Sequence, residues 1–267
     1  MSEIFNNENF IKDKYKFSLV SHNLDYSEHE ILSDGSSYAI VIGKPNKEIW
    51  IWTDDNIKPE KYQEMFNHLT DITEINDYSF VCTPEVYDYL KYDTSFPLNE
   101  PFVYDNYICN KPIEPKKCDA VISRATLEDK DTIAIYWKEN CEHFGYNDVS
   151  LELCLRFDES WIASGNFYVL KNSSKIVSFL GYDVVDKTAE ISHAYTAPSE
   201  RGKGYMPYLI YNVSKLILGQ GLTPVLNTDY SYTSSNNAYK KVGFEETGLM
   251  YSFSSARHLN KKNTMKR

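Results

Sequence analysis

Two glycines one residue apart, Gly202 and Gly204, limit what the C-terminal half of this chain can fold into. They follow an alternating apolar segment that predicts a strand over 189–196, and they precede apolar residues at helical spacing from 205 onward. Pro207 lies three residues after Gly204, and proline is tolerated only in the first turn of a helix, where its missing N–H costs nothing. The helix is therefore expected to begin near Gly204, directly after a strand and a glycine turn.

The same patterns give an order of elements for the rest of the C-terminal half. A strand over 119–126 comes first, and Thr126 is positioned to cap a helix that runs to residue 141. A second helix is expected over 149–157. The remaining expected elements are strands over 166–172, 175–185 and 189–196, the helix after Gly204, a strand over 223–230, a short helix over 234–242 and a strand over 249–255.

The N-terminal half predicts the same order, two strands followed by helix, strand, helix and strand, within residues 36–109. A diverged structural repeat of 175–254 explains this, and coincidence between short elements is the open alternative. The segment KPIEPKK at 111–117 is typical of a linker. We therefore expect an N-terminal α/β domain over 1–116, a second domain over 117–255 and a basic tail over 256–267.

Composition narrows the classes of function. The net charge is -10 although residues 256–267 hold five Lys or Arg and no acid, so the remainder is strongly acidic and unsuited to nucleic acid. The tail is either a solvated end or an arm that touches RNA. Five scattered cysteines without a C-x-x-C pair predict reduced thiols and no metal site, and no apolar run approaches 18 residues. Together with a polar N-terminus, this predicts a cytoplasmic protein without a membrane span.

The glycine turn itself predicts an anion site. A strand that feeds a helix through small residues presents unpaired backbone N–H groups, which the helix dipole reinforces. Arg201 and Lys203 add positive charge in an otherwise acidic chain, which favours a pyrophosphate. The segment is neither G-x-G-x-x-G, because position 207 is proline, nor a P-loop, which needs G-K-[ST]. A tight turn without any ligand is the alternative.

Two motifs carry a resemblance to a known family. The first, Arg201-Gly202-Lys203-Gly204-Tyr205-Met206, resembles the R/Q-x-x-G-x-G/A signature of the GNAT superfamily of N-acetyltransferases, between its fourth strand and third helix. The second, SNNAYKKVGF at 235–244, resembles the family's S-N-x-x-Y-x-K-x-G-F segment. The resemblance covers about residues 117–255. Met206 stands where the family has Gly or Ala, and Tyr232 stands where many relatives have Asn.

The resemblance implies an α/β (α+β) fold with a mixed, mostly antiparallel sheet flanked by helices. The smaller preceding α/β domain would be a degenerate half of the same kind. This arrangement of a degenerate N-terminal and a catalytic C-terminal half is similar to that of the glycine N-acyltransferases. The implied activity is direct transfer of an acetyl group from acetyl-CoA to a primary amine, without a metal. The implied cofactor contacts are Tyr195 and Thr196 for the pantetheine arm, the 201–206 loop for the pyrophosphate, and Asn236.

Direct transfer needs a base for the amine and an acid for the departing thiolate. Glu190 has the spacing from Arg201 at which some family members place a catalytic glutamate, and His193 is the rival base. The resemblance makes Tyr239 the candidate acid. A solvated carboxylate, a half-buried imidazole and a core tyrosine are the structural alternatives for these three residues.

Another class of function also remains open, a non-catalytic acyl-CoA-binding regulatory module. The acceptor is a small cationic molecule, a lysine or an N-terminal amine, and the acidic body favours a cation. Whether the chain acts as a homodimer is left open.

Overall fold

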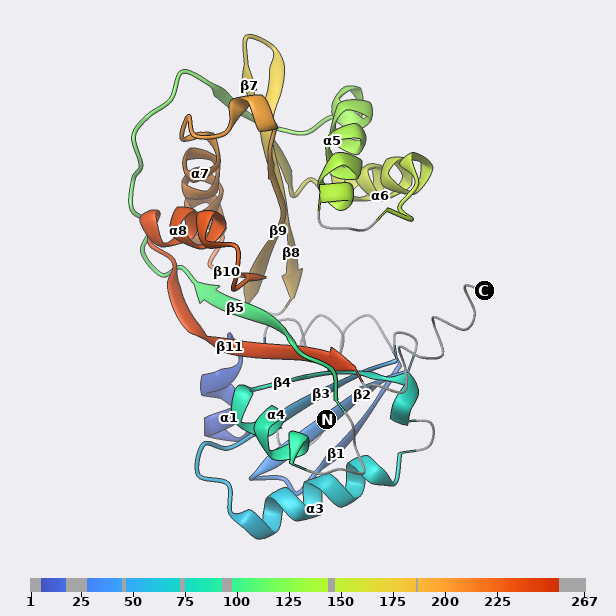
Figure 1. Cartoon of the computed structure of the whole chain (residues 1–267). Coiled ribbons are helices and arrows are strands. Elements are labelled where there is room, and N and C mark those ends of the chain that lie inside the picture. The colour runs from blue at the N-terminus through green and yellow to red at the C-terminus, as the bar shows by residue number, and fades with distance from the viewer. Residues whose placement is uncertain are drawn as a thin grey trace. The chain divides into compact units, whose positions relative to one another are not determined.

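The computed structural model describes residues 6–17, 28–44, 47–72, 75–92, 98–143, 147–185 and 187–254 (Figure 1). The predicted basic tail at 256–267 lies outside them. The chain forms two compact units, of which unit 1 takes 1–107, 227–231 and 246–267, and unit 2 takes 108–226 and 232–245. This division by contacts differs from the single boundary expected near residue 116, because the C-terminal strand belongs to unit 1. The domain boundary in the sequence stays a prediction.

Unit 1 is a sheet with helices, in the strand order β1-β2-β3-β4-β11-β5. Most of its printed pairs are antiparallel, but β3 and β4 run parallel, as a helical crossover between them requires. The strands are β1 (His29–Ser33), β2 (Tyr38–Gly43), β3 (Glu48–Thr53), β4 (Ser79–Cys82), β5 (Phe102–Ile108) and β11 (Glu245–Ser254). The helices are α1 (Glu8–Asp13), α3 (Pro59–Thr70) and α4 (Pro84–Lys91), with a 3₁₀ turn at Ile75–Asp77.

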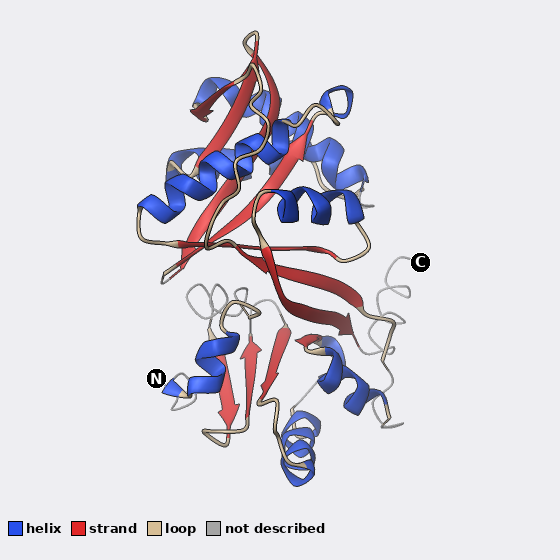
Figure 2. Ribbon diagram, turned by 90° about the vertical axis from the view of Figure 1, so that its left-hand side faces the viewer, coloured by secondary structure: helices blue, strands red, loops and turns tan. Residues whose placement is uncertain are grey.

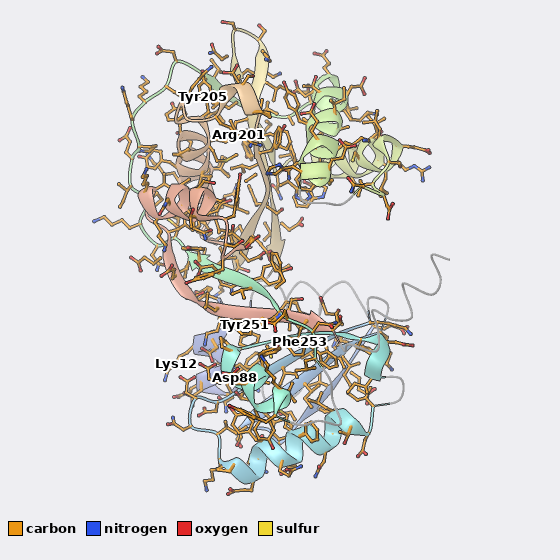
Figure 3. The ribbon with its side chains drawn as sticks, in the orientation of Figure 1. Lys12, Asp88, Arg201, Tyr205, Tyr251 and Phe253 are labelled. Atoms are coloured by element: carbon orange, nitrogen blue, oxygen red, sulfur yellow. The ribbon has the colours of Figure 1, made fainter. Side chains whose placement is uncertain are left out.

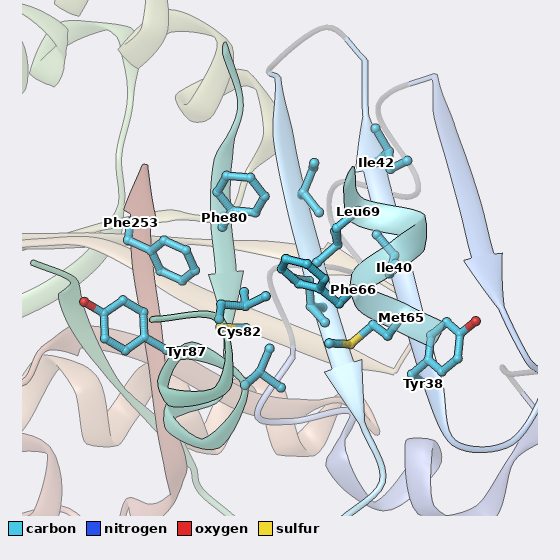
Figure 4. Close-up of a cluster of buried hydrophobic side chains, with 14 residues drawn as sticks. Tyr38, Ile40, Ile42, Met65, Phe66, Leu69, Phe80, Cys82, Tyr87 and Phe253 are labelled. Atoms are coloured by element: carbon cyan, nitrogen blue, oxygen red, sulfur yellow. The ribbon is translucent and has the colours of Figure 1, made fainter. Parts of the chain in front are cut away.

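The core of unit 1 lies on both faces of its sheet, which is why every residue of β2 is buried. Successive side chains of a strand point to opposite faces, so Tyr38, Ile40 and Ile42 pack with α3 and α4 while Ala39 and Val41 join a second cluster. Figure 4 shows the first cluster. In it, Phe253 of β11 stacks on Phe80 of β4 with ring centroids 5.4 Å apart.

Unit 2 has the strand order β10-β9-β8-β7-β6. Helices α5 and α6 lie on one face of this sheet and α7 and α8 on the other, so it forms three layers (Figures 1 and 2). The strands are β6 (Val121–Arg124), β7 (Phe167–Asn172), β8 (Lys175–Val185), β9 (Thr188–Thr196) and β10 (Thr223–Asp229), the last of which has its residues 227–229 in unit 1. The helices are α5 (Lys130–His143), α6 (Leu151–Ser164), α7 (Tyr205–Gly219) and α8 (Thr233–Lys241), with 3₁₀ turns at Leu127–Asp129 and Pro198–Glu200.

The predicted fold class, a mixed and mostly antiparallel sheet flanked by helices, is confirmed. Thr126 caps as expected, in a reciprocal box with Asp129. The helix expected over 149–157 is longer, because it ends only where Gly165 adopts the left-handed conformation. The pairing of β2-β3-β4, antiparallel then parallel, recurs in β8-β9-β10. Descent of the two units from a repeat stays a prediction.

Candidate functional site

Strand β9 contains a bulge at the site. Its pairing with β8 passes from Phe179↔Tyr195 to Gly181↔Ser192, so β9 has one more residue than β8 in this interval. The extra length is taken up at His193, which has a φ of 54° in the left-handed region that residues other than glycine seldom adopt. Bulges of this kind redirect side chains and end regular pairing.

The ladder between β9 and β10 ends early. Its register runs only from Thr188↔Thr223 to Glu190↔Val225, so residues 191–196 of β9 have no partner on β10. Alternate backbone groups of a strand point toward each neighbouring strand. This edge of β9 therefore presents N–H and C=O groups that the β10 ladder does not use, on the side where a ligand could lie.

The glycine turn follows β9 directly. Gly202 and Gly204 have φ values of 77° and 82°, and Gly204 is the N-cap of α7. A Cβ built at either position meets no atom within 4 Å, so these glycines are required by the backbone conformation and not by crowding. The turn surface is consequently open at these two positions; Figure 3 labels Arg201 and Tyr205, the residues that precede and follow the turn in the chain.

The first turn of α7 leaves backbone donors unused by the helix. Tyr208 is the first residue whose N–H bonds within it, to the Gly204 carbonyl at 3.2 Å. The N–H groups of Gly204, Tyr205 and Met206 precede that bond, and Pro207 has none to offer. No side chain caps this end of the helix. The start of α7 thus combines donors that the helix does not use with the positive end of the helix dipole.

The two cations of the turn have different environments. Lys203 forms an ion pair with Glu200 at 2.7 Å, which raises the pKa of the ammonium and offsets its charge. The Nε of Arg201 donates to the Thr196 carbonyl at 3.1 Å, and its guanidinium lies 5.9 Å from the centre of the Tyr195 ring. Within the described residues no carboxylate forms an ion pair with Arg201, so its charge remains available to an anion.

The second motif places its tyrosine in a buried position. Tyr239 on α8 is 7% exposed, and its ring meets the edge of Phe244 at 6.0 Å. Burial raises the pKa of its hydroxyl, while a hydrogen bond with Ser235 acts in the opposite direction. Asn236 is buried in the same helix. Gly243, with a φ of 93°, admits no side chain because a Cβ would lie 2.5 Å from the Lys111 carbonyl.

The two base candidates have contrasting surroundings. Glu190 is 7% exposed and occupies the last position of β9 that pairs with β10. The imidazole of His193 lies between two indoles, with ring centroids 4.4 Å from Trp137 and 4.5 Å from Trp161, and its Nδ1 is 2.9 Å from the Ser192 hydroxyl. This burial lowers the pKa of His193 to about 4, so the ring is neutral at pH 7.

Sequence patterns did not single out the aromatic surroundings of this strand. Tyr136 and Trp137 come from α5 and Trp161 from α6, and Glu139 of α5 accepts a hydrogen bond from the Tyr195 hydroxyl at 3.0 Å. Gly181 is part of the same construction, because a Cβ there would come within 2.8 Å of the Trp161 ring. The pairing across β8 and β9 creates this cluster, and it leaves no local signal.

Of the predicted cofactor residues, the structure brings Tyr195, Thr196 and Arg201 together at the end of β9, next to the turn formed by 202–206. The backbone carbonyl of Tyr195 accepts a hydrogen bond from the Ser178 hydroxyl, and that of Thr196 accepts one from the Arg201 side chain. The candidate base and acid lie on separate elements, β9 and α8.

Two features were not found in the described part of the chain. No cluster of three or more His, Cys, Asp or Glu side chains there is arranged to hold a metal ion. Every helix described is too short or too polar to cross a bilayer.

Comparison with known proteins agrees with this architecture. Residues 132–244 match the model of the acetyltransferase (GNAT) family. The fold is similar to a GNAT-family acetyltransferase from Colwellia psychrerythraea, at 12% identity and a TM-score of 0.61, covering 91% of this chain and 89% of that one. It is also similar to a GCN5-related N-acetyltransferase from Kribbella flavida, at 10% identity and a TM-score of 0.58, covering 90% and 93%. No curated protein matches the chain.

Proposed function

We propose that this chain, whose residues 132–244 match the GNAT acetyltransferase family, transfers an acetyl group from acetyl-CoA to a primary amine. One observation carries the proposal: the part of β9 that does not pair with β10 is followed directly by helix α7, which begins after Gly204 without a side-chain cap. An extended amide-bearing arm ending in a pyrophosphate has the two chemistries that such an edge and such a helix start recognise.

The residues present fit the CoA part of this co-substrate. The N–H groups of Gly204, Tyr205 and Met206 would bind the pyrophosphate, with Arg201 supplying charge, and Gly202 and Lys203 completing the loop. Thr196 would bind a pantetheine amide, since its carbonyl, which accepts a bond from Arg201, has a second lone pair, and Tyr195 is proposed as the neighbouring contact. Asn236 is proposed as a further contact. The acetyl thioester supplies the activated acyl group when bound.

Tyr239 is proposed as the acid. A hydroxyl whose pKa is raised by burial keeps its proton throughout the neutral range, so it is available to a thiolate as that leaves. The buried position also excludes water from the hydroxyl, which strengthens a hydrogen bond made there. Packing against Phe244 fixes the ring.

Glu190 is proposed as the base, and His193 is the alternative. Glu190 lies where the β10 ladder ends, so it is at the start of the unladdered edge. Burial between the indoles lowers the pKa of His193 to about 4. His193 is therefore a weaker general base than an ordinary histidine, because the efficiency of a base falls as its pKa drops below the working pH. At neutral pH its ring is already unprotonated, so no acid limb near pH 6.5 is expected from it.

The choice of base predicts different pH profiles. Glu190→Gln is expected to lower kcat/KM at pH 7 and to recover activity as the pH approaches about 10, where an alkylamine loses its proton unaided. His193→Gln is expected to change activity much less. Profiles of kcat/KM from pH 6 to 10 for both variants check this. If the larger loss and the alkaline recovery belong to His193→Gln instead, the base is His193.

A thiol-release assay tests the proposed function. The purified chain with acetyl-CoA and a panel of primary amines is expected to release free CoA thiol only when both are present, and CoA alone is expected to raise Tm. Stabilisation by CoA without turnover of any amine would favour the second candidate, a non-catalytic acyl-CoA-binding module. If CoA does not raise Tm and no amine is turned over, both candidate functions are contradicted.

The proposed setting is the cytoplasm. All five cysteines are thiols in the structure, and four of them are buried. Thiols of this kind fit a reducing compartment. The proposed partner is a small-molecule or peptide amine, and neither a nucleic acid nor a membrane is invoked.

A further inference from the structure

The layer formed by α5 and α6 has more negative charge than its own cations balance. Residues 127–164 contain nine Asp or Glu and three Lys or Arg. Each of those three cations is already paired with a glutamate of the same layer, in the pairs Lys130–Glu159, Lys138–Glu142 and Arg156–Glu152. None of these pairs involves Glu139, so its carboxylate adds to the negative charge of this face.

Glu139 is held beside the candidate site. Its carboxylate is exposed, yet it accepts a 3.0 Å hydrogen bond from the hydroxyl of Tyr195, whose ring is buried in β9. Tyr195 lies in the part of β9 that the β10 ladder leaves open. Burial and the neighbouring carboxylate raise the pKa of the Tyr195 hydroxyl, so the hydroxyl remains the donor of this hydrogen bond and Glu139 its acceptor.

The surface beside Glu139 is aromatic. Tyr136 packs 5.5 Å from Tyr195, and Trp137 and Trp161 enclose His193, all three rings being only partly buried. Partly exposed Trp and Tyr rings attract organic cations through their faces. His193 does not oppose this, because its ring is neutral between the indoles at pH 7. The cluster thus combines a fixed carboxylate with rings that suit an alkylammonium.

The chemistry of acetyl transfer determines which cationic group of the acceptor Glu139 can bind with benefit to the reaction. The amine that attacks a thioester must be neutral, so a carboxylate that bound only this nitrogen would stabilise its unreactive ammonium form. A carboxylate set among aromatic rings is useful to the reaction when it binds a second cationic group of the same molecule, because that group stays charged throughout.

We propose that Glu139, with the rings of Tyr136 and Trp137, binds a second positive charge of the acceptor, so that the preferred substrate is a diamine or a guanidino-amine with an apolar spacer. This inference rests on the proposed acetyl transfer and specifies its acceptor. Glu139 is a specificity-determining residue in this scheme and takes no part in proton transfer.

Matched acceptors test the proposal. Wild-type protein is expected to prefer 1,4-diaminobutane to n-butylamine in kcat/KM, and to use 4-aminobutanoate least. Glu139→Gln keeps an oxygen that accepts from Tyr195 but removes the charge. It is expected to lower kcat/KM for the diamine about 10- to 100-fold, chiefly through KM, as a charge-assisted contact is lost, and to leave n-butylamine nearly unchanged.

A control and a second measurement separate the outcomes. Glu142→Gln removes an exposed carboxylate of the same helix that already pairs with Lys138, so it should not alter the preference. Equal losses for diamine and monoamine in Glu139→Gln, or no preference in the wild type, would overturn the inference and leave the transferase intact. Calorimetry of 1,4-diaminobutane binding with CoA present tests the charge contact without turnover, and equal affinity of wild type and Glu139→Gln there would also overturn it.

Discussion

Tyr239→Phe is expected to lower kcat by about 10²- to 10⁴-fold while the affinity for CoA stays nearly unchanged. The substitution keeps the ring that packs against Phe244 and removes only the hydroxyl. Because burial raises the pKa of that hydroxyl, the wild type should keep its acid across the neutral range, so no loss of activity near neutral pH is expected from Tyr239. Steady-state kinetics and CoA titration measure the two quantities separately.

Tyr211→Phe is the matched control for this experiment. Tyr211 is also a mostly buried tyrosine in a helix of unit 2, and no role in transfer is proposed for it. A drop in kcat that is equally large in Tyr211→Phe would indicate a general effect of losing a buried hydroxyl. A Tyr239→Phe variant with parental kcat and a lower Tm would make Tyr239 a packing residue and leave the acid unassigned.

Gly204→Val is expected to abolish stabilisation of the fold by CoA. A branched side chain at a φ of 82° is strained, and the backbone it forces would turn the first N–H groups of α7 away from an anion. Since ligand at 100 times its Kd stabilises by about 2.7 kcal/mol, the loss is large enough to see in a thermal melt. The measurement is the change in Tm on adding CoA, after circular dichroism has shown that the variant is folded.

Gly219→Ala provides the comparison for Gly204→Val. It lies in the last turn of the same helix, and a Cβ there meets nothing within 4 Å. This variant should respond to CoA like the parent. A folded Gly204→Val protein that CoA still stabilises fully would place the pyrophosphate elsewhere.

The elements that sequence predicts well here are those with a local cause. Pro207 and Gly204 restrict where α7 begins, and the structure starts that helix at Tyr205. Thr126 and Asp129 cap one another within four residues, so their motif is also visible in the sequence. The helix α1 and the strand β1 were not predicted, because their sequences ENFIKD and HEILS are largely polar, and neither element contains a fully buried residue.

The surroundings of the candidate catalytic groups depend on pairing between distant segments. Trp137, Trp161 and His193 come from three elements and meet where β9 bulges, between its pairings with Phe179 and Gly181 of β8. The motif positions of Glu190 and Tyr239 could be read from the chain, but their burial could not. The lowered pKa of His193 follows from the indoles on both sides of it, so it too required the structure.

The last strand has a consequence for the order in which the protein can be completed. Residues 251–254 of β11 pair with β4, and Phe253 enters the core of the N-terminal unit. The first hundred residues therefore supply only β1 to β4 of this sheet, and one edge of β4 has no partner until β11 has been synthesised. The N-terminal unit acquires its full core only when the chain is almost finished, so a nascent or truncated chain lacking β11 would expose Phe80 and an open sheet edge to chaperones and to other copies of itself.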